Sequence, residues 1–230
     1  MIGRAWLVVL ASVGTLPGFG AAQTPAYRDG WTSWSVAAGA GIFAALPGWL
    51  NLPRGAPPCA PCDPATLSGI DRWVVRLDSK AAGTASNVLL VGVVGGGFLA
   101  SETRGNAAMM ANALAFTSLA TEWTKALVHR SRPILYTAQA PSAAGDRDNR
   151  RSFPSGHTST AFAVATSYAV MARRQHLPHA TRNSILLFSG AAGVGSMRVA
   201  AGRHFVTDVM GGAVLGAGIG WLTAKVFPTK

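Results

Sequence analysis

Long apolar stretches separated by short polar segments make up most of the chain. A transmembrane helix needs about 20 mostly apolar residues, and several stretches reach or approach that length. They are residues 31–50, 82–101, 106–121, 161–172, 184–201 and 205–224. Between residues 67 and 77, apolar side chains recur at helical spacing among Asp71, Arg72 and Arg76, which predicts a short helix at the membrane interface. We therefore predict an all-α, polytopic membrane helix bundle with about six transmembrane helices.

Composition and charge agree with a membrane protein and argue against a nucleic-acid partner. Hydrophobic residues make up 49% of the 230 residues and charged residues only 13%, whereas soluble domains carry about 25% charged residues. The 27 glycines suit helices that pack closely in a bilayer. The net charge of +11 comes from basic residues between the apolar stretches, a placement that favours anionic lipids over nucleic acid.

Residues 1–22 resemble a secretory signal peptide. Arg4 precedes an apolar stretch, and small residues precede a candidate cleavage site before Gln23. Cleavage there would leave the new N-terminus outside the cytoplasm, so residues 31–50 could not cross the membrane and five spans would remain. An uncleaved leader restores six spans. In both cases residues 23–230 are expected to form a single membrane domain.

The cysteines of this chain, Cys59 and Cys62, lie in a Pro-rich loop at residues 51–64. One such pair does not complete a zinc site, and no histidine follows Cys62 as c-type haem attachment requires. If the loop lies outside the cytoplasm, a local disulfide is the plainest interpretation. No metal is expected.

The segment Ser152–Thr160, SFPSGHTST, combines a tight turn with the start of a helix. A helix start presents unpaired N–H groups and the positive end of the helix dipole, which makes the turn at Ser155 and Gly156 a candidate phosphate site. The neighbouring His157 can transfer a proton near neutral pH. A capped helix with a surface histidine is the structural alternative.

Two further charged clusters lie at the ends of predicted spans, on the same side as this turn. Ionisable residues at membrane depth mark functional sites. Lys125, Arg132 and Arg198 can surround a dianion, with bidentate contacts from each arginine. His204 and Asp208 are four residues apart and would share one face of a helix. A carboxylate on one imidazole nitrogen leaves the other free to attack.

Each of these charges also has a structural interpretation. Lys125 can extend to the interface or pair with Glu122, three residues earlier. Arg198 can pair with Asp208 inside the bundle, and residues 150–151 suit a solvated basic rim. We favour the functional interpretation because all three clusters lie at the same end of different spans.

The clusters form three ordered motifs, K-x6-RP, PSGH and R-x5-H-x3-D, within residues 125–208. This pattern resembles the signature of the type-2 phosphatidic acid phosphatase superfamily, which includes membrane lipid-phosphate phosphatases, bacterial acid phosphatases and vanadium haloperoxidases. The resemblance covers about residues 82–227. It departs from the family at Met197, because the family usually has Ser directly before the third-motif arginine.

The resemblance implies a role for each motif residue. His204 would be the nucleophile that forms a phosphohistidine, Asp208 would orient it, and His157 would protonate the leaving oxygen. The remaining motif residues would bind the phosphate: Lys125, Arg132, Ser155, Gly156 and Arg198. Phosphoryl transfer requires positioning and charge neutralisation, which these side chains and the helix start can supply without a metal or cofactor.

We therefore expect a phosphatase of a bacterial-type inner membrane, with its site facing the periplasm and lipid phosphates or diphosphates as substrates. By resemblance, undecaprenyl diphosphate ranks first, followed by phosphatidylglycerol phosphate, phosphatidic acid and lipid A phosphate. The positive-inside rule would instead place the arginine-rich loop 128–156 in the cytoplasm. The alternatives are a non-catalytic anion transporter or lipid-binding membrane protein, and a vanadate-dependent haloperoxidase.

Overall fold

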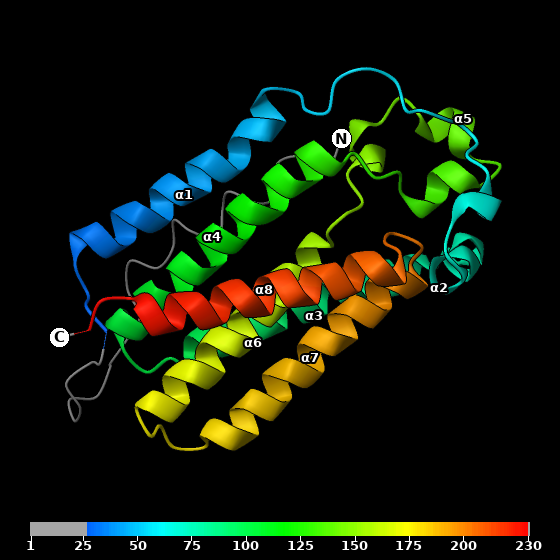
Figure 1. Ribbon diagram of the computed structural model, residues 1–230. Coiled ribbons are helices and arrows are strands. Elements are labelled where there is room, and N and C mark those ends of the chain that lie inside the picture. The colour runs from blue at the N-terminus through cyan, green and yellow to red at the C-terminus, as the bar shows by residue number, and fades with distance from the viewer. Residues whose placement is uncertain (1–26, 230) are drawn as a thin grey trace.

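The computed structural model describes residues 27–229, which are almost entirely helical and loop segments. The predicted leader, residues 1–22, lies outside this range. Within the range, long helices of 19 to 25 residues form a bundle (Figure 1): α1 (Trp31–Trp49), α3 (Lys80–Leu99), α4 (Arg104–Val128), α6 (Gly156–Arg174), α7 (Ala180–Ala200) and α8 (Val206–Val226). Short helices lie in the loops: α2 (Gly69–Arg72), α5 (Ala140–Ala143) and 3-10 turns at Pro64–Thr66, Trp73–Arg76, Pro133–Tyr136 and Arg147–Arg150. The all-α prediction is confirmed for the described residues.

Two helices in this part of the chain have the length and hydropathy expected of a membrane span. Helices α3 and α8 are long and apolar enough to cross a bilayer. The predicted stretches at α1, α4, α6 and α7 do form helices of at least 19 residues, but they do not reach the same combination of length and hydropathy. The count of about six spans therefore stays a prediction.

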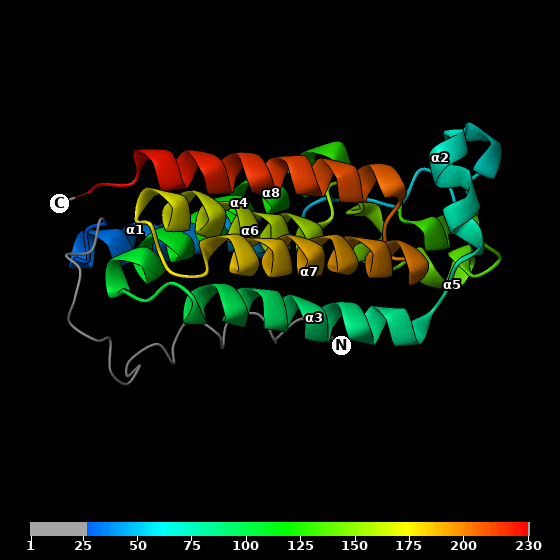
Figure 2. The same cartoon turned by 90° about the horizontal axis from the view of Figure 1, so that it is seen from below.

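Helix α6 lies at the centre of the bundle and packs against α3, α4, α7 and α8, while α1 packs against α4. Figure 2 shows α3 and α8 on opposite sides, with α6 and α7 between them. Large buried side chains from α4, α6 and α7 fill the core, among them Met109, Met110, Val164, Tyr168 and Val194. The start of α6, which carries the PSGH motif, is therefore surrounded by the ends of other helices.

Helix α8 approaches α6 through a stripe of glycines at Gly212, Gly216 and Gly220. A Cβ atom at Gly216 would lie 2.0 Å from the carbonyl oxygen of Ser159, and one at Gly220 would lie 2.5 Å from that of Ala163. Small residues every four positions let two helix backbones come this close. The stripe therefore fixes the register of α8 on α6.

The segments that carry the motifs gather at one end of the bundle, where the short helices also lie (Figure 1). The amide of Ser79 donates a 3.2 Å hydrogen bond to the carbonyl of Ala200, and that of Cys62 donates a 2.7 Å bond to Leu135. In the same loop a disulfide joins Cys59 to Cys62. The N-terminal loops thus cover the end of the bundle at which the charged motifs meet.

The glycine stripe predicts unequal effects of the same substitution along α8. Gly216→Ala should lower the free energy of unfolding by about 1–3 kcal/mol, because its new Cβ would press on the α6 backbone. Gly218→Ala is the matched control, since no atom lies within 4 Å of its Cβ position. Thermal or denaturant unfolding in detergent measures both variants, and equal effects would contradict the proposed packing.

Candidate functional site

The three cations expected to bind phosphate come from different elements and are all buried. Lys125 lies in the last turn of α4, Arg132 follows that helix, and Arg198 lies in the last turn of α7. Their exposed fractions are 9%, 8% and 9%. Lys and Arg are almost never this buried unless they are paired. The burial therefore excludes the interpretation of Lys125 as a side chain that simply extends to solvent.

The PSGH turn presents the start of α6 to these cations. The Nζ atom of Lys125 lies so close to Gly156 that a Cβ atom there would be only 3.2 Å from it. The buried side chain of Ser155 accepts a 3.0 Å hydrogen bond from Thr158 Oγ1 and makes no capping bond to the described part of α6. The first N–H groups of the helix therefore remain available to an anion.

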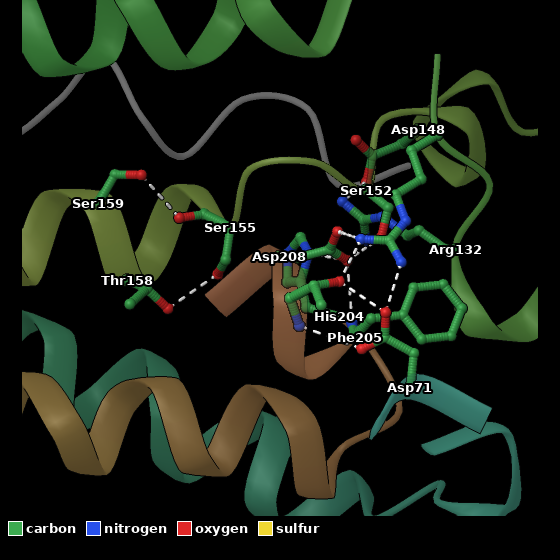
Figure 3. Close-up of polar contacts among 12 residues, drawn as sticks. Asp71, Arg132, Asp148, Ser152, Ser155, Thr158, Ser159, His204, Phe205 and Asp208 are labelled. Carbon is green, nitrogen blue, oxygen red and sulfur yellow. Dashed lines mark hydrogen bonds and ion pairs between the residues drawn. The ribbon is translucent and has the colours of Figure 1, made fainter. Parts of the chain in front are cut away.

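Acidic side chains pair with two of the cations. Glu122 lies 2.9 Å from Lys125 and 2.6 Å from Arg151, so the structural pairing of Glu122 with Lys125 is present. Asp148 lies 2.8 Å from Arg132, with 57% of its side chain exposed (Figure 3). Desolvation alone would raise the pKa of Asp148, but Arg132, Lys125 and Arg151 together hold it below its usual value. A charged carboxylate thus lies where the motif cations meet.

Four buried guanidinium groups in residues 27–229 still have an unpaired donor. These are the Nε atoms of Arg132, Arg150, Arg151 and Arg198. Arg150 donates through its Nη atoms to the carbonyls of Pro53 and Arg54, whereas the other three lie in the charged site. Electrostatic interactions connect Arg132 to Arg198, and Asp148 to both Arg132 and Arg151. Leaving a buried donor unpaired costs about 1–3 kcal/mol. An anion with several acceptor oxygens would supply the missing partners.

His204 and Asp208 face one another, but not from one face of a helix. Helix α8 begins at Val206, so His204 precedes it, while Asp208 lies in its first turn. The prediction of a shared helix face is therefore wrong. The Asp208 side chain instead turns back toward the start of α8. Its Oδ2 accepts a 2.9 Å hydrogen bond from the Phe205 amide and lies 3.6 Å from His204 Nδ1.

The imidazole of His204 is held in its neutral form. Its exposed fraction is 2%, and this burial is the main reason that its pKa falls to about 4, although Asp208 opposes the shift and Arg132 and Arg198 add to it. Because that pKa lies well below 7, the ring is unprotonated at neutral pH. Nδ1 points at Asp208, so Nε2 is the nitrogen that can attack a phosphorus atom.

His157, the expected proton donor, is half-buried at the start of α6. Its Nε2 lies 2.7 Å from Oδ1 of Asn87 on α3. It also interacts electrostatically with His204 and the motif cations. The structure therefore places the two histidines and the three cations of the motifs in one site.

The hydroxyl expected before Arg198 has no replacement on α7. Ser196 is exposed, and its Oγ bonds to the carbonyl of Ala192 in its own helix at 3.0 Å. The buried Ser86 of α3 instead lies 3.5 Å from Arg198 Nη1. In this chain, Met197 takes the place of the family's serine. A hydroxyl from another helix therefore approaches Arg198.

Sequence reasoning missed several residues of this site. Arg151 was expected in a solvated rim but is only 7% exposed, and Asn87 and Asp148 lie in no motif. No spacing in the sequence relates these residues to the site, because they reach it only through tertiary contacts. Among residues 27–229, no cluster of three or more His, Cys, Asp or Glu side chains could hold a metal ion.

Comparison with known proteins agrees with the motifs. Lipid A 1-phosphatase of Porphyromonas gingivalis is 35% identical over 83 residues, which cover 33% of this chain and 17% of that relative's length. A solved structure, the first transmembrane PAP2 type phosphatidylglycerolphosphate phosphatase from Bacillus subtilis, has a TM-score of 0.47 and 24% identity. That match covers 86% of this chain and 96% of the solved chain. The family model described as PAP2 superfamily matches residues 106–230, more than half of the chain. The protein therefore belongs to the PAP2 superfamily.

Proposed function

We propose that this protein is a membrane phosphatase that hydrolyses a lipid phosphate or diphosphate through a phosphohistidine at His204. The observation that carries the proposal is the set of buried, unpaired Nε donors on Arg132, Arg151 and Arg198. They lie in one charged site with the uncharged His204 ring and the Asp208 carboxylate beside it. Such a site attracts an anion with several oxygens and offers it a nucleophile.

Each half of the reaction uses the same two histidines. In the first half, Nε2 of His204 attacks phosphorus, the P–N bond forms, and the P–O bond to the leaving group breaks. His157 donates its proton to the leaving oxygen, and Asp208 stabilises the positive charge that develops on the His204 ring. In the second half, water attacks the phosphohistidine while His157 removes a proton from it, which releases phosphate and restores His204.

The motif cations stabilise the negative charge of the phosphoryl group that is transferred. Phosphoryl transfer spreads negative charge over three equatorial oxygens, so catalysis is mostly positioning and electrostatic stabilisation. Lys125, Arg132 and Arg198 supply this stabilisation, and the start of α6 adds backbone N–H groups near Ser155 and Gly156.

Two observations support a lipid substrate and an extracytoplasmic site. Outward-facing apolar side chains on α3, α7 and α8 are highly exposed, including Val91 at 70% and Val214 at 75%, which suits contact with a bilayer. The Cys59–Cys62 disulfide lies at the site's end of the bundle and suits an oxidising compartment. The similarity to a lipid A 1-phosphatase supports testing lipid A phosphate, the last of the expected substrates, beside undecaprenyl diphosphate.

Phosphate release in detergent tests the proposal. Purified protein should release phosphate from undecaprenyl diphosphate, phosphatidic acid or lipid A with EDTA present, and His204→Ala should lose nearly all turnover. His176→Asn is the control, because His176 is exposed in the turn between α6 and α7. A folded protein that releases phosphate from none of these lipids would contradict the proposal and favour a binding or transport role.

The pH dependence of kcat should be bell-shaped. The nucleophile must be neutral, and burial lowers the pKa of His204 to about 4, so activity is lost as the pH falls through that value. The base limb belongs to the substrate complex, in which the negative charge of the bound phosphate offsets the cations around His157 and lets its ring keep the proton that it donates. A rate that rises steadily with pH across the whole histidine range would contradict the assigned roles.

Asp148 should compete with phosphate for Arg132. Asp148→Asn removes a charge that pairs with Arg132 and repels the product, so inorganic phosphate should inhibit this variant up to about fivefold more tightly, the scale of an exposed ion pair. Asp146→Asn is the matched control, because an asparagine oxygen can still accept the Asp148 amide bond that Asp146 accepts. Equal inhibition constants in Asp148→Asn and the wild type would contradict the competition.

A further inference from the structure

A second buried carboxylate, Asp71, lies next to the His204–Asp208 pair (Figure 3). Asp71 belongs to the short helix α2 and is 2% exposed. Its Oδ2 accepts hydrogen bonds from Arg130 Nη2 at 2.8 Å and from Thr207 Oγ1 at 2.6 Å. Its Oδ1 accepts a 3.1 Å bond from the Thr207 amide. Asp71 thus holds the first turn of α8, next to the helix start that carries Asp208.

Arg130 connects the two carboxylates. Its Nη1 donates to Asp208 Oδ1 at 2.5 Å and to Thr207 Oγ1 at 2.6 Å, while Nη2 reaches Asp71. The guanidinium carbon lies 4.6 Å from the centre of the Phe205 ring, which restricts its movement further. A planar guanidinium with several donors can hold two carboxylates at once, which a lysine cannot do with the same geometry.

The positive charge of Arg130 does not fully neutralise Asp208, because Arg130 also pairs with Asp71. Burial alone would raise the pKa of Asp71, but hydrogen bonds from Thr207 and Arg130 hold it below its usual value, so Asp71 is ionised. With Asp71 present, two carboxylates share one guanidinium, and the network keeps a net negative charge. Without it, Arg130 would neutralise Asp208 alone. Asp208 would then stabilise the charge on the attacking imidazole less well.

Asp208 depends on these contacts for its orientation. Its Oδ2 accepts bonds from Ser152 Oγ at 2.5 Å and from the Phe205 amide at 2.9 Å, and its Oδ1 accepts only the Arg130 bond among the described residues. A guanidinium released from Asp71 could therefore let the carboxylate rotate. Asp71 lies outside the stretch matched by the family, residues 106–230, and outside all three motifs.

We propose that Asp71 is a positioning residue for phosphoryl transfer, which through Arg130 holds the Asp208 carboxylate toward His204 and preserves its negative charge. The inference rests on the proposed function of His204 as the nucleophile. Asp71 touches neither substrate nor His204, so its effect passes through Arg130 and Asp208. The cations that bind phosphate are not part of this network.

Steady-state kinetics separate this role from a merely structural one. Asp71→Asn should lower kcat on the order of tenfold, the scale for removing the partner that orients a functional histidine, and leave KM within about twofold because phosphate binding is intact. Asp78→Asn is the matched control, an exposed aspartate just beyond the same short helices, and should match the wild type. A fall in kcat that is equal in both variants, or a change in KM alone, would overturn the proposal.

A double-mutant cycle tests the route through Asp208. In an Asp208→Asn background, Asp71→Asn should have little further effect, because the group through which it acts has already lost its charge. Additive losses would show that Asp71 acts independently. Arg130→Lys serves as a second variant should Asp71→Asn fold poorly, and it should also lower kcat with little change in KM.

The tautomer of His204 gives a measurement that needs no turnover. Nitrogen NMR of histidine-labelled protein, with His204 assigned from His204→Gln, should show a proton on Nδ1 in the wild type and a mixture of tautomers in Asp71→Asn. An unchanged tautomer in that variant would refute the positioning role. Absence of phosphate release by the wild type would instead refute the proposed function, so the two failures are distinguishable.

Discussion

The structure of the site depends on a concentration of buried positive charge that the protein itself only partly neutralises. Lys125, Arg132, Arg151 and Arg198 are each less than 10% exposed, and Glu122 and Asp148 pair with three of them. Charges taken out of water this far require partners. A phosphate group meets that requirement with several oxygens at once. Burial is the main reason that the pKa of His204 falls, and Arg132 and Arg198 lower it further, so two of the cations that would bind the anion also help to keep its nucleophile neutral.

Close packing of the starts of α6 and α8 fixes the relative positions of the groups in this site. The glycine stripe lets the backbone of α8 lie against that of α6, and the Ser155 amide donates a 3.0 Å bond to the carbonyl of Asp208. The PSGH turn and the His204–Asp208 pair are therefore held together by the backbone rather than by flexible side chains. Rigid elements of this kind are what precise positioning of a reacting group requires.

The sequence predicted the helices and the motif residues better than it predicted what supports them. Apolar length identifies α3 and α8, and motif spacing identifies Lys125 and His204, because both signals are local. The contacts of Asp71 with Thr207 join residues 136 positions apart, which no local pattern indicates. The predicted shared helix face is wrong because Asp208, the third residue of α8, bonds back to the Phe205 amide at the helix start, and His204 lies outside the helix.

Chemical trapping of the intermediate tests the mechanism most directly. The protein is mixed with a lipid phosphate that is radiolabelled in the transferred phosphoryl group, and the reaction is quenched within one turnover. The proposed mechanism predicts label on the protein that survives alkali and is released by acid, as a phosphohistidine requires, and no label on His204→Ala. Label on His204→Ala, or label that survives acid and is lost in alkali, would place the phosphoryl group on another side chain and contradict the role of His204.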